Sequence, residues 1–314
     1  MQIVILDTAT LGTDINFSIL EKERDLTKYQ TTNSSQTAKR IESADIIITN
    51  KVIIGKNEMQ NAKKLKLICV AATGTNNIDI EEAKKRDIVV ANVKNYSTEA
   101  VAQHTISLIL SLQNSLIEFA NETKSGNWSK SPIFTMLNHP FNELKGKKLG
   151  VIGYGTIGKR LAELAKVFGV EILVGKRKGI NYNDTQRIDI EILIRESDII
   201  SIHTPLTEST KNLFSAKEFK MMKKSAFIIN TARGGIINEN DLYNALKNKD
   251  IRAAAIDVTE NEPIQANHPL LELDNIIITP HIAWTSVESR KKLFEGIVNN
   301  IKLFKAGRSK EIMV

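Results

Sequence analysis

The stretch KKLGVIGYGTIGKRLAELAKVFGVEILV, from Lys147 to Val174, decides the expected fold. An apolar run from Leu149 to Ile152 precedes a glycine-rich turn, and a second apolar run from Ile172 to Val174 ends the stretch. Apolar residues between them recur at helical spacing: Ile157, Leu161, Leu164, Ala165 and Phe168. The stretch therefore predicts a strand, a tight turn, a helix and a second strand.

The turn contains the spacing G-x-G-x-x-G, which is typical of dinucleotide-binding loops. Gly153 allows a sharp exit from the strand, Gly155 lets a pyrophosphate approach bare backbone, and Gly158 lets helix and strand pack closely. The helix N-terminus then offers its N–H groups to the phosphates. This spacing also occurs by chance in plain glycine-rich turns, but the flanking strand and helix favour a dinucleotide site.

Composition is that of an ordinary globular protein, with 42% hydrophobic and 25% charged residues. The 314 residues are enough for two domains. No run reaches the roughly 18 apolar residues of a membrane span, and the N-terminus lacks the pattern of a signal peptide. The single cysteine, Cys69, lies in an apolar run and is expected to be a buried strand residue. A cytoplasmic location without a membrane partner is expected.

A net charge of +7 could suggest nucleic acid, but the basic residues are scattered in twos and threes without interleaved aromatic residues. We therefore expect no nucleic-acid partner, and interpret the charge as mild steering of small anions.

The N-terminal part predicts a small parallel α/β domain, because apolar runs alternate with polar, helix-compatible segments. The expected strands are Ile3 to Leu6, Ile46 to Thr49, Leu67 to Ala71 and Ile88 to Ala91. A single long amphipathic helix is then expected from Ser97 to about Glu122, and the irregular segment from Lys124 to Gly146 is interpreted as the main linker.

Beyond the glycine loop the alternation continues and brings the number of expected strands to six, that of a complete doubly wound dinucleotide domain. The four further strands are Asp198 to His203, Ala226 to Asn230, Ala253 to Asp257 and Ile276 to Thr279. Asn238 is expected to begin one helix, and a capping box at Thr285 and Glu288 to begin the last, which Gly307 ends.

The last helix follows a complete domain, so we expect it to return to the N-terminal one. The fold expected is a Rossmann-type doubly wound domain over residues 99–285, plus a smaller flavodoxin-like α/β substrate domain formed by 1–98 and 286–314.

Three polar segments follow the later strands, and each contains a residue suited to one part of a carbonyl reduction. Arg233 has the planar fork that grips a carboxylate at two points. His281 can donate a proton to the oxygen of a 2-oxo carbon as hydride arrives, and can accept it in the reverse direction. Glu262 is placed to favour the charged imidazole and to fix which nitrogen faces the substrate. Singly, each could be an ion pair, a cap or a structural histidine; jointly they favour a catalytic site.

With these segments the sequence resembles the D-isomer-specific 2-hydroxyacid dehydrogenase family, whose catalytic Arg, Glu and His occur in this order. The resemblance also covers AATGTNNID from Ala71, NVKNYSTEAVAQHT from Asn92 and TPHIAW from Thr279, which look most like the glycerate dehydrogenase and hydroxypyruvate reductase branch. It implies an NAD(P)-dependent enzyme that reduces a small anionic 2-oxo acid, such as hydroxypyruvate or glyoxylate, to the D-2-hydroxy acid.

The resemblance also implies roles for further residues. Backbone N–H groups around Thr73 and Gly74 would hold the substrate carboxylate beside Arg233, and Trp284 would shape the pocket. Asp257 would accept a hydrogen bond from the nicotinamide carboxamide. His104, near the start of a predicted helix, is interpreted from its position as structural or as lying at the domain hinge. The cofactor-binding set implied is Gly153, Gly155, Thr156, Ile157, Gly158, Lys176, Arg177, His203, Pro205, Thr210, Thr231, Ala232, Asp257 and His281.

The second strand ends in Lys176 and Arg177 instead of the acid that usually binds the ribose of NAD. We therefore expect NADP(H) to be preferred, with NAD(H) left open. A homodimer is expected from the family, formed by the region after the first long helix.

Alternatives remain within and beyond this class. A phosphoglycerate dehydrogenase usually continues beyond the last helix, and a formate dehydrogenase usually has Gln at the position of Glu262. A cofactor-sensing corepressor on the same fold is the alternative from another class, since such proteins can retain the three catalytic residues.

Overall fold

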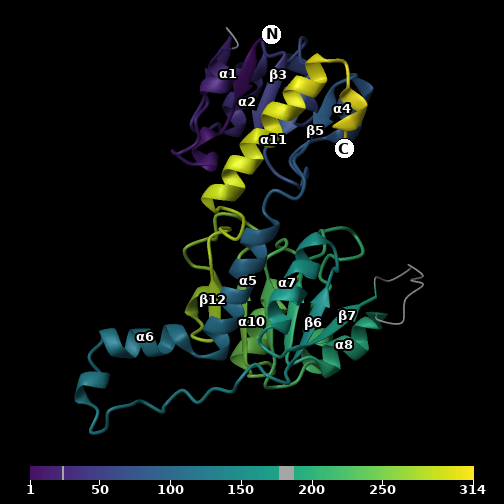
Figure 1. Ribbon diagram of the computed structural model, residues 1–314. Helices are drawn as coiled ribbons and strands as arrows, with labels where there is room; N and C mark the ends of the chain where they lie inside the picture. Colours follow the sequence, from purple (N-terminus) through teal and green to yellow (C-terminus); the bar gives the residue numbers. More distant parts are fainter. Residues whose placement is uncertain (23–24, 177–186) are drawn as a thin grey trace. The chain divides into compact units, whose positions relative to one another are not determined.

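The computed structural model describes residues 1–22, 25–176 and 187–314 (Figure 1). The chain divides into two compact units: Met1–Ser97 with Thr285–Val314, called unit 1 here, and Thr98–Trp284, called unit 2. Both divisions fall one residue before the boundaries expected from the sequence. The C-terminal helix belongs to unit 1, together with the N-terminal part of the chain.

Unit 1 contains, in its described residues, a five-stranded parallel sheet of order β2-β1-β3-β4-β5, the strand order of flavodoxin-like folds. Its strands are β1 (Ile3–Ile5), β2 (Leu26–Lys28), β3 (Ile46–Thr49), β4 (Leu67–Val70) and β5 (Val89–Ala91). The sequence did not predict β2, because this short edge strand, LTK, has no apolar run. Cys69 is fully buried in β4 as predicted, and burial raises its pKa to about 12.

Helices cover both faces of this sheet. They are α1 (Ser18–Glu21), α2 (Ser34–Ile41), α3 (Lys56–Asn61), α4 (Ile80–Lys85) and α11 (Val287–Lys305). Residues of α2, α3 and α4 share one apolar core with alternate residues of the strands, and α11 packs against β4. A capping box at Thr285 and Glu288 was predicted, but Ser286 is the N-cap of α11: its side chain accepts the N–H of Ser289, and no glutamate completes a box. Gly307, at φ 75°, lies just beyond its end, as expected.

Unit 2 contains, among its described residues, a seven-stranded parallel sheet of order β12-β11-β10-β9-β6-β7-β8. The strands are β6 (Lys148–Ile152), β7 (Glu171–Gly175), β8 (Arg187–Ile188), β9 (Ile199–Ile202), β10 (Phe227–Asn230), β11 (Ala253–Ile256) and β12 (Ile276–Ile278). All six predicted strands are present, and the doubly wound order is confirmed. The seventh, β8, adds a two-residue edge beside β7.

The side chains of alternate strand residues in unit 2 belong to two apolar cores, one on each face of the sheet. Helices α5 (Thr98–Gln113) and α7 (Thr156–Lys166) cover one face, while α8 (Ile190–Glu196), α9 (Ala216–Met221) and α10 (Glu239–Lys247) cover the other (Figure 1). Asn238 caps α10 as predicted. Phe168, which the helical spacing placed in this helix, lies beyond the end of α7 and is exposed.

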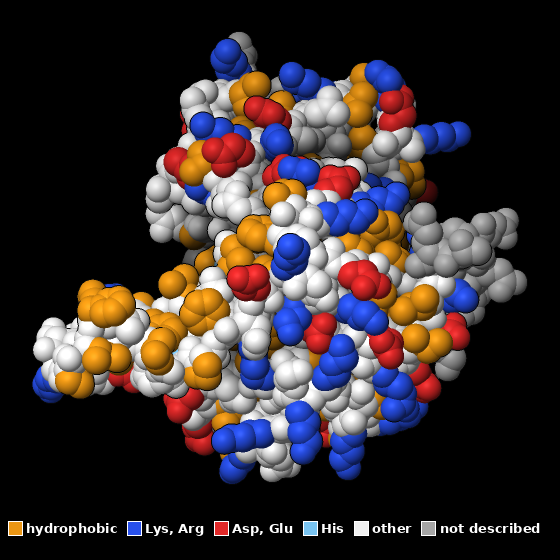
Figure 2. Space-filling model, turned by 60° about the horizontal axis from the view of Figure 1, so that its bottom comes forward, with side chains coloured by type: hydrophobic (Ala, Val, Ile, Leu, Met, Phe, Trp, Pro, Cys, Tyr) orange, Lys and Arg blue, Asp and Glu red, His pale blue; other side chains and the backbone are white. Residues whose placement is uncertain are grey.

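The single long helix expected after Ser97 is two helices. α5 ends at Gln113, Ser115 adopts φ 47°, and α6 (Leu116–Lys124) leaves in a new direction. The segment 124–146 therefore does not link the two units: together with α6 it forms an arm within unit 2 (Figure 1). Large apolar side chains gather on this arm (Figure 2), among them Phe134 and Leu137, which are 90% and 76% exposed.

Among the described residues, no helix is both long enough and apolar enough to span a lipid bilayer.

Candidate active site

The glycine loop has the geometry that its spacing predicts. Gly153 leaves β6 at φ 94°, where a side chain would be strained. A Cβ on Gly158 would lie 2.2 Å from the carbonyl oxygen of Gly153, so only glycine allows α7 to pack this closely on the turn. Gly155 precedes the first residue of α7, and a Cβ there would meet nothing within 4 Å. The loop therefore leaves open space in front of the helix N-terminus, as a pyrophosphate requires.

A cavity of about 1090 Å³ lies beside this loop. Its lining includes six of the predicted cofactor-binding residues: Gly153, Gly155, Lys176, His203, Pro205 and Thr210. Thr156, Ile157 and Gly158 form the first turn of α7 next to it. The Thr210 hydroxyl donates to the carbonyl oxygen of Pro205 at 2.7 Å and fixes that loop. Arg177 lies outside the described residues.

The far end of the cavity carries charges of both signs. Lys176 directly follows β7, and its Nζ lies 3.8 Å from Oδ1 of Asp189, the residue after β8. Arg187, in β8 itself, also lines the cavity. Of these three residues only Lys176 was predicted from the sequence, because no pattern around Arg187 and Asp189 indicates a strand.

His203 lies at the end of β9 in this cavity. Burial lowers its pKa to about 4, so the imidazole is neutral at ordinary pH. Its Nε2 is 2.8 Å from Oγ of Ser201. The ring therefore adds no charge to the cavity.

His281 and Glu262 form a close pair in unit 2. Nδ1 of His281 lies 2.8 Å from Oε2 and 2.9 Å from Oε1 of Glu262. Their side chains are 22% and 31% exposed, so the pair is partly shielded from water. The backbone N–H of Thr259 donates to Oε1 of Glu262 at 3.4 Å and holds the carboxylate. With Nδ1 engaged, Nε2 of the imidazole is left to face a substrate.

The backbone around His281 is strained, and hydrogen bonds to Asp257 hold it in place. His281 has φ 55°, which is uncommon for a residue with a side chain. The fully buried Asp257 accepts the N–H of Ile282 at 2.8 Å, the N–H of Ala283 at 2.8 Å and the Thr279 hydroxyl at 2.6 Å. These three bonds fix the loop on both sides of His281, so the ring is presented in one direction.

Arg233 follows β10 in a loop shaped by Asn230. The buried Asn230 side chain donates to the carbonyl oxygen of Arg233 at 2.8 Å and accepts the N–H of Ala232 at 3.0 Å. Nη1 of Arg233 donates to the carbonyl oxygen of Ala232 at 2.7 Å. A Cβ on Gly234 would lie 2.0 Å from the carbonyl oxygen of Thr259, so this glycine brings the loops of Arg233 and Glu262 into contact.

A second set of polar contacts ties these loops to helices. His104 of α5 has Nε2 3.1 Å from the Thr279 hydroxyl, which places it under the His281 loop, and Thr105 contacts the Thr231 hydroxyl at 3.2 Å. Glu239 of α10 accepts the N–H of Glu260 at 2.7 Å. From the sequence, His104 was expected to be structural or to lie at the domain hinge, and its contact with Thr279 joins residues 175 positions apart.

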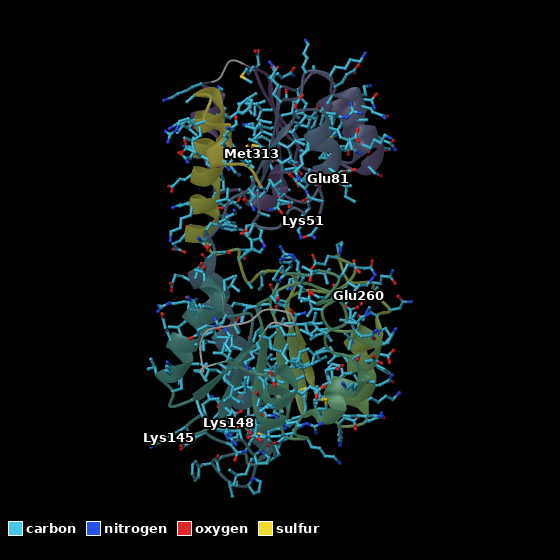
Figure 3. All side chains as sticks on the ribbon, turned by 90° about the vertical axis from the view of Figure 1, so that its right-hand side faces the viewer. Lys51, Glu81, Lys145, Lys148, Glu260 and Met313 are labelled. Carbon is cyan, nitrogen blue, oxygen red and sulfur yellow. The ribbon has the colours of Figure 1, made fainter. Side chains whose placement is uncertain are left out.

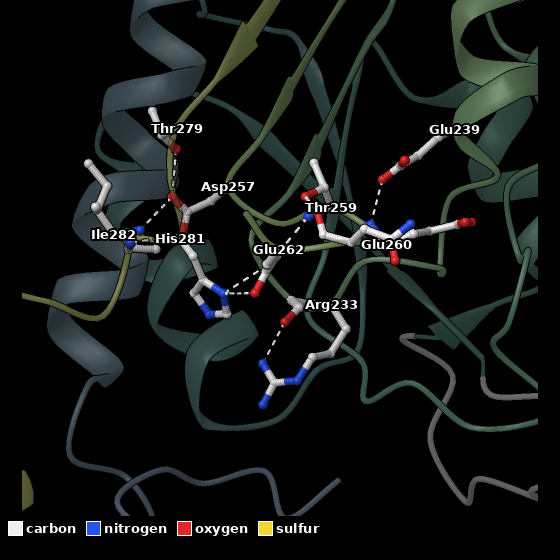
Figure 4. A network of polar contacts seen from close by, with 12 residues as sticks. Arg233, Glu239, Asp257, Thr259, Glu260, Glu262, Thr279, His281 and Ile282 are labelled. Atoms are coloured by element: carbon white, nitrogen blue, oxygen red, sulfur yellow. Dashed lines mark hydrogen bonds and ion pairs between the residues drawn. The ribbon is translucent and has the colours of Figure 1, made fainter. Parts of the chain in front are cut away.

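Unit 2 therefore brings Arg233, Glu262 and His281 together, each on a loop at the carboxyl edge of the sheet. The His281 ring and the Arg233 guanidinium extend in the same direction from these loops, with Glu262 beside them (Figure 4). An acid–base group, its carboxylate partner and a carboxylate-binding fork are what the reduction of a 2-oxo acid needs. Trp284 ends this unit half-buried, whereas Thr73 and Gly74 lie in unit 1, in the loop after β4.

Residues 106–283 match the family model described as D-isomer specific 2-hydroxyacid dehydrogenase, NAD binding domain. The chain belongs to this family. It is 36% identical to a glycerate dehydrogenase of Methylorubrum extorquens over 99% of this chain and 98% of the relative. As a family member, the chain is an oxidoreductase of the 2-hydroxyacid dehydrogenase type, and its doubly wound unit 2 is the nicotinamide-dinucleotide domain.

Two solved structures of this architecture were determined with cofactor. One is an acyclic imino acid reductase in complex with NADPH and D-Arg, with a TM-score of 0.87 and 29% identity, covering 100% of both chains. The other is a D-lactate dehydrogenase from Aquifex aeolicus complexed with NAD and lactic acid, with a TM-score of 0.85 and 28% identity, covering 100% of this chain and 99% of that one. NADPH and NAD thus each occur in a solved structure whose fold is similar to that of this dehydrogenase.

Proposed function

We propose that this dehydrogenase reduces a small 2-oxo acid to the D-2-hydroxy acid, with hydroxypyruvate and glyoxylate as the substrates that fit best. The observation that carries the proposal is the Glu262–His281 pair, 2.8 Å apart, on the sheet edge that also carries Arg233. The relative named glycerate dehydrogenase supports a three-carbon hydroxy acid as the reduced product.

Each of the three residues has one task in this reaction. The nicotinamide cofactor supplies the hydride when it is bound. The Arg233 guanidinium binds the substrate carboxylate and polarises the adjacent carbonyl. His281 donates the proton from Nε2 to the carbonyl oxygen as charge develops there, while Glu262 stabilises the imidazolium through Nδ1. Asp257 and Asn230 hold the loops that carry these groups.

The direct test is turnover by the purified chain. Hydroxypyruvate, glyoxylate, pyruvate and 3-phosphohydroxypyruvate are supplied separately with NADH and NADPH, and loss of cofactor absorbance is followed. We expect the highest kcat/KM with hydroxypyruvate or glyoxylate and a D-configured product. If the chain binds reduced cofactor but turns over none of these acids, the proposal fails and a cofactor-sensing role on the same fold gains support.

Preference for NADP(H) is proposed from the basic end of the cofactor cavity. Lys176 and Arg187 both line it, and either could pair with a ribose 2′-phosphate. Asp189, 3.8 Å from Lys176, opposes this preference because it would repel the phosphate. We therefore expect NADPH to be favoured modestly, with Lys176 as the deciding residue.

Charge variants in this cavity test the cofactor proposal. Lys176→Ala should raise the KM for NADPH about tenfold with little change for NADH, and Asp189→Asn should lower the KM for NADPH. Lys217→Met is the matched control, because Lys217 lines the same cavity but pairs with Glu191 at 3.0 Å. If the KM for NADPH rose equally in Lys176→Ala and Lys217→Met, the effect would come from the loss of any positive charge near the cavity, and Lys176 would not be the deciding residue.

A homodimer through the arm is also proposed. Its exposed residues Trp128, Ile133, Phe134, Leu137 and Phe141 would otherwise leave a large apolar surface in water. The double variant Phe134→Glu with Leu137→Glu should halve the mass measured by sedimentation. Val167→Glu, which alters an apolar residue of unit 2 that is 84% exposed and lies off the arm, should not. A monomeric wild-type chain would contradict the proposal.

A further inference from the structure

Glu239, in the first turn of α10, contacts the loop that carries Glu262 at two points. Its Oε1 accepts the backbone N–H of Glu260, two residues before Glu262, at 2.7 Å (Figure 4; Glu260 is also labelled in Figure 3). Its Oε2 lies 3.0 Å from Nε2 of His268, six residues after Glu262. The side chains of Glu239 and His268 are 12% and 21% exposed, so water competes little for this contact. One carboxylate thus holds the chain on both sides of Glu262.

The contacts of His268 show in which direction its hydrogen bonds run. Nδ1 of His268 accepts the backbone N–H of Leu270 at 3.3 Å. A ring nitrogen that accepts a hydrogen bond carries no hydrogen, so Nε2 is the donor to Glu239. Leu270 is fully buried in an apolar core of unit 2, which fixes the far end of the loop. Glu239 therefore accepts one hydrogen bond from each side of the loop.

The peptide group between Thr259 and Glu260 is held on two sides. Its N–H donates to Glu239, and its carbonyl oxygen lies where a Cβ on Gly234 would approach to 2.0 Å. The next bonds lead directly to Glu262, because the N–H of Thr259 donates to Oε1 of Glu262 at 3.4 Å. A shift of this peptide group would therefore move the carboxylate that contacts His281.

A simpler role for Glu239 is to stabilise α10, because an acidic residue in the first turn of a helix interacts favourably with the helix dipole. The N-terminus of α10 is already capped by Asn238, whose side chain accepts the N–H of Asp241 at 3.0 Å. The two bonds of Glu239 described above both go to the segment 260–268 instead of to its own helix. Its contacts therefore point to the loop as the part of the molecule that it serves.

We propose that Glu239, supported by His268, is a positioning residue of the reaction: it holds the backbone before Glu262 so that the Glu262 carboxylate meets Nδ1 of His281. Glu239 acts through the backbone of Glu260 and not on the reacting atoms. The inference rests on the proposed function and deepens it. The contact that it secures, 2.8 Å between Glu262 and His281, is a hydrogen bond whose strength depends steeply on distance and angle.

A double-mutant cycle between positions 239 and 262 tests the proposal. Glu239→Ala removes the acceptor, so kcat for the best substrate of the wild type should fall about tenfold, while the Kd for reduced cofactor stays within about twofold. In a Glu262→Ala background the same change should lower kcat less than about twofold, because no carboxylate remains to be positioned. A loss of kcat that is equal in the two backgrounds would overturn the inference.

Glu239→Gln separates the two bonds. Its amide oxygen can still accept the N–H of Glu260, whereas its NH2 group cannot accept the hydrogen of His268. Its kcat should therefore lie between that of the wild type and that of Glu239→Ala. A kcat as low as that of Glu239→Ala would mean that the bond to Glu260 does not matter, and would overturn the inference.

Asp241→Ala is the matched control. Asp241 lies in the same turn of α10, and its Oδ2 also accepts a backbone N–H, that of Ala216 at 3.1 Å. The variant therefore removes the same charge from the same helix end without loss of a bond to the Glu262 loop, and its kcat should stay within about twofold of the wild type. A fall as large as that of Glu239→Ala would reduce the effect to helix stability and overturn the inference.

His268→Ala serves if Glu239→Ala does not fold. It removes only the donor to Oε2 of Glu239 and should lower kcat a few-fold, again only while Glu262 is present. An equal loss without Glu262 would overturn the inference.

The two proposals fail in different ways. A wild-type chain that is inactive toward every 2-oxo acid overturns both. An active wild type in which the effects at positions 239 and 262 are independent overturns only the role of Glu239.

Discussion

At the carboxyl edge of each of the two sheets, a buried aspartate fixes a neighbouring loop, but the two loops differ. In unit 1, Asp7 beyond β1 accepts the hydroxyl of Thr49 and the N–H groups of Asn50 and Lys51. In unit 2, Asp257 beyond β11 accepts the hydroxyl of Thr279 and the N–H groups of Ile282 and Ala283. In each case a buried aspartate at one strand end fixes the loop that leaves the neighbouring strand.

The difference lies in two residues. After Thr49 the two bonded N–H groups follow at once, but after Thr279 the chain first makes a turn through Pro280 and His281. Within that turn His281 adopts φ 55°. Such a conformation costs about 1 kcal/mol or more and persists only where neighbouring bonds hold it. The unit 2 loop therefore carries a side chain suited to acid–base chemistry, whereas the unit 1 loop has only its backbone fixed.

The largest expected effect breaks the reactive side of this comparison. His281→Gln keeps a polar side chain but removes the proton donor, so kcat should fall on the order of 10³-fold while the cofactor Kd changes little. His139→Gln is the matched control, because His139 lies on the arm, away from both loops. Steady-state kinetics and cofactor fluorescence titration supply the two numbers. A fall of less than tenfold would remove His281 from the chemistry.

The next effect concerns the carboxylate beside the ring. In Glu262→Gln the ring loses its negative partner at Nδ1, so the positive charge on the imidazole is stabilised less during the reaction. Because reduction and oxidation both use this ring, kcat should fall about 10- to 100-fold in both directions. The rate is measured in each direction with saturating cofactor. A kcat identical to that of the wild type would contradict the role of Glu262.

Much of this could be predicted from the sequence, for a local reason. Buried parallel strands are continuous apolar runs, and the glycine loop has a fixed spacing. Arg233, Glu262 and His281 each lie within a few residues of a strand end. Such signals lie within a few residues of the feature that they predict. The family resemblance added the order of the three residues.

What the sequence could not predict depends on partners far along the chain. Asp7 and its loop are more than 40 positions apart, and Asp257 and its loop 25, so neither aspartate carries a local sign of its task. The break between α5 and α6 falls at Asn114 and Ser115, without glycine or proline to mark it. Asp189 reaches Lys176 only through the short edge strand β8, which no apolar run announces.

A paired substitution sharpens the comparison at smaller amplitude. Thr279→Val removes the hydroxyl between His104 and Asp257, so the His281 loop loses part of its support and kcat should fall about tenfold with unchanged substrate KM. Thr49→Val removes the corresponding hydroxyl in unit 1, whose loop carries none of Arg233, Glu262 and His281, so kcat should stay within about twofold of the wild type. Michaelis–Menten curves for both variants decide it. If both variants lowered kcat equally, the two loops would not differ in their effect on the reaction.

The smallest expected effect concerns His203, at the end of β9. Unlike His281, it has no carboxylate partner among the hydrogen bonds and ion pairs of the described residues. Because burial lowers the pKa of His203 from 6.5 to about 4, folding favours the neutral ring. The stability it contributes is therefore complete above pH 6.5 and is lost as the pH falls toward 4. The wild-type Tm should fall by a few degrees over this window, and His203→Asn should show a shallower fall. Calorimetry from pH 7 to 4 measures both slopes, and equal slopes would mean that His203 is already solvated and cannot offer its neutral face to the cofactor.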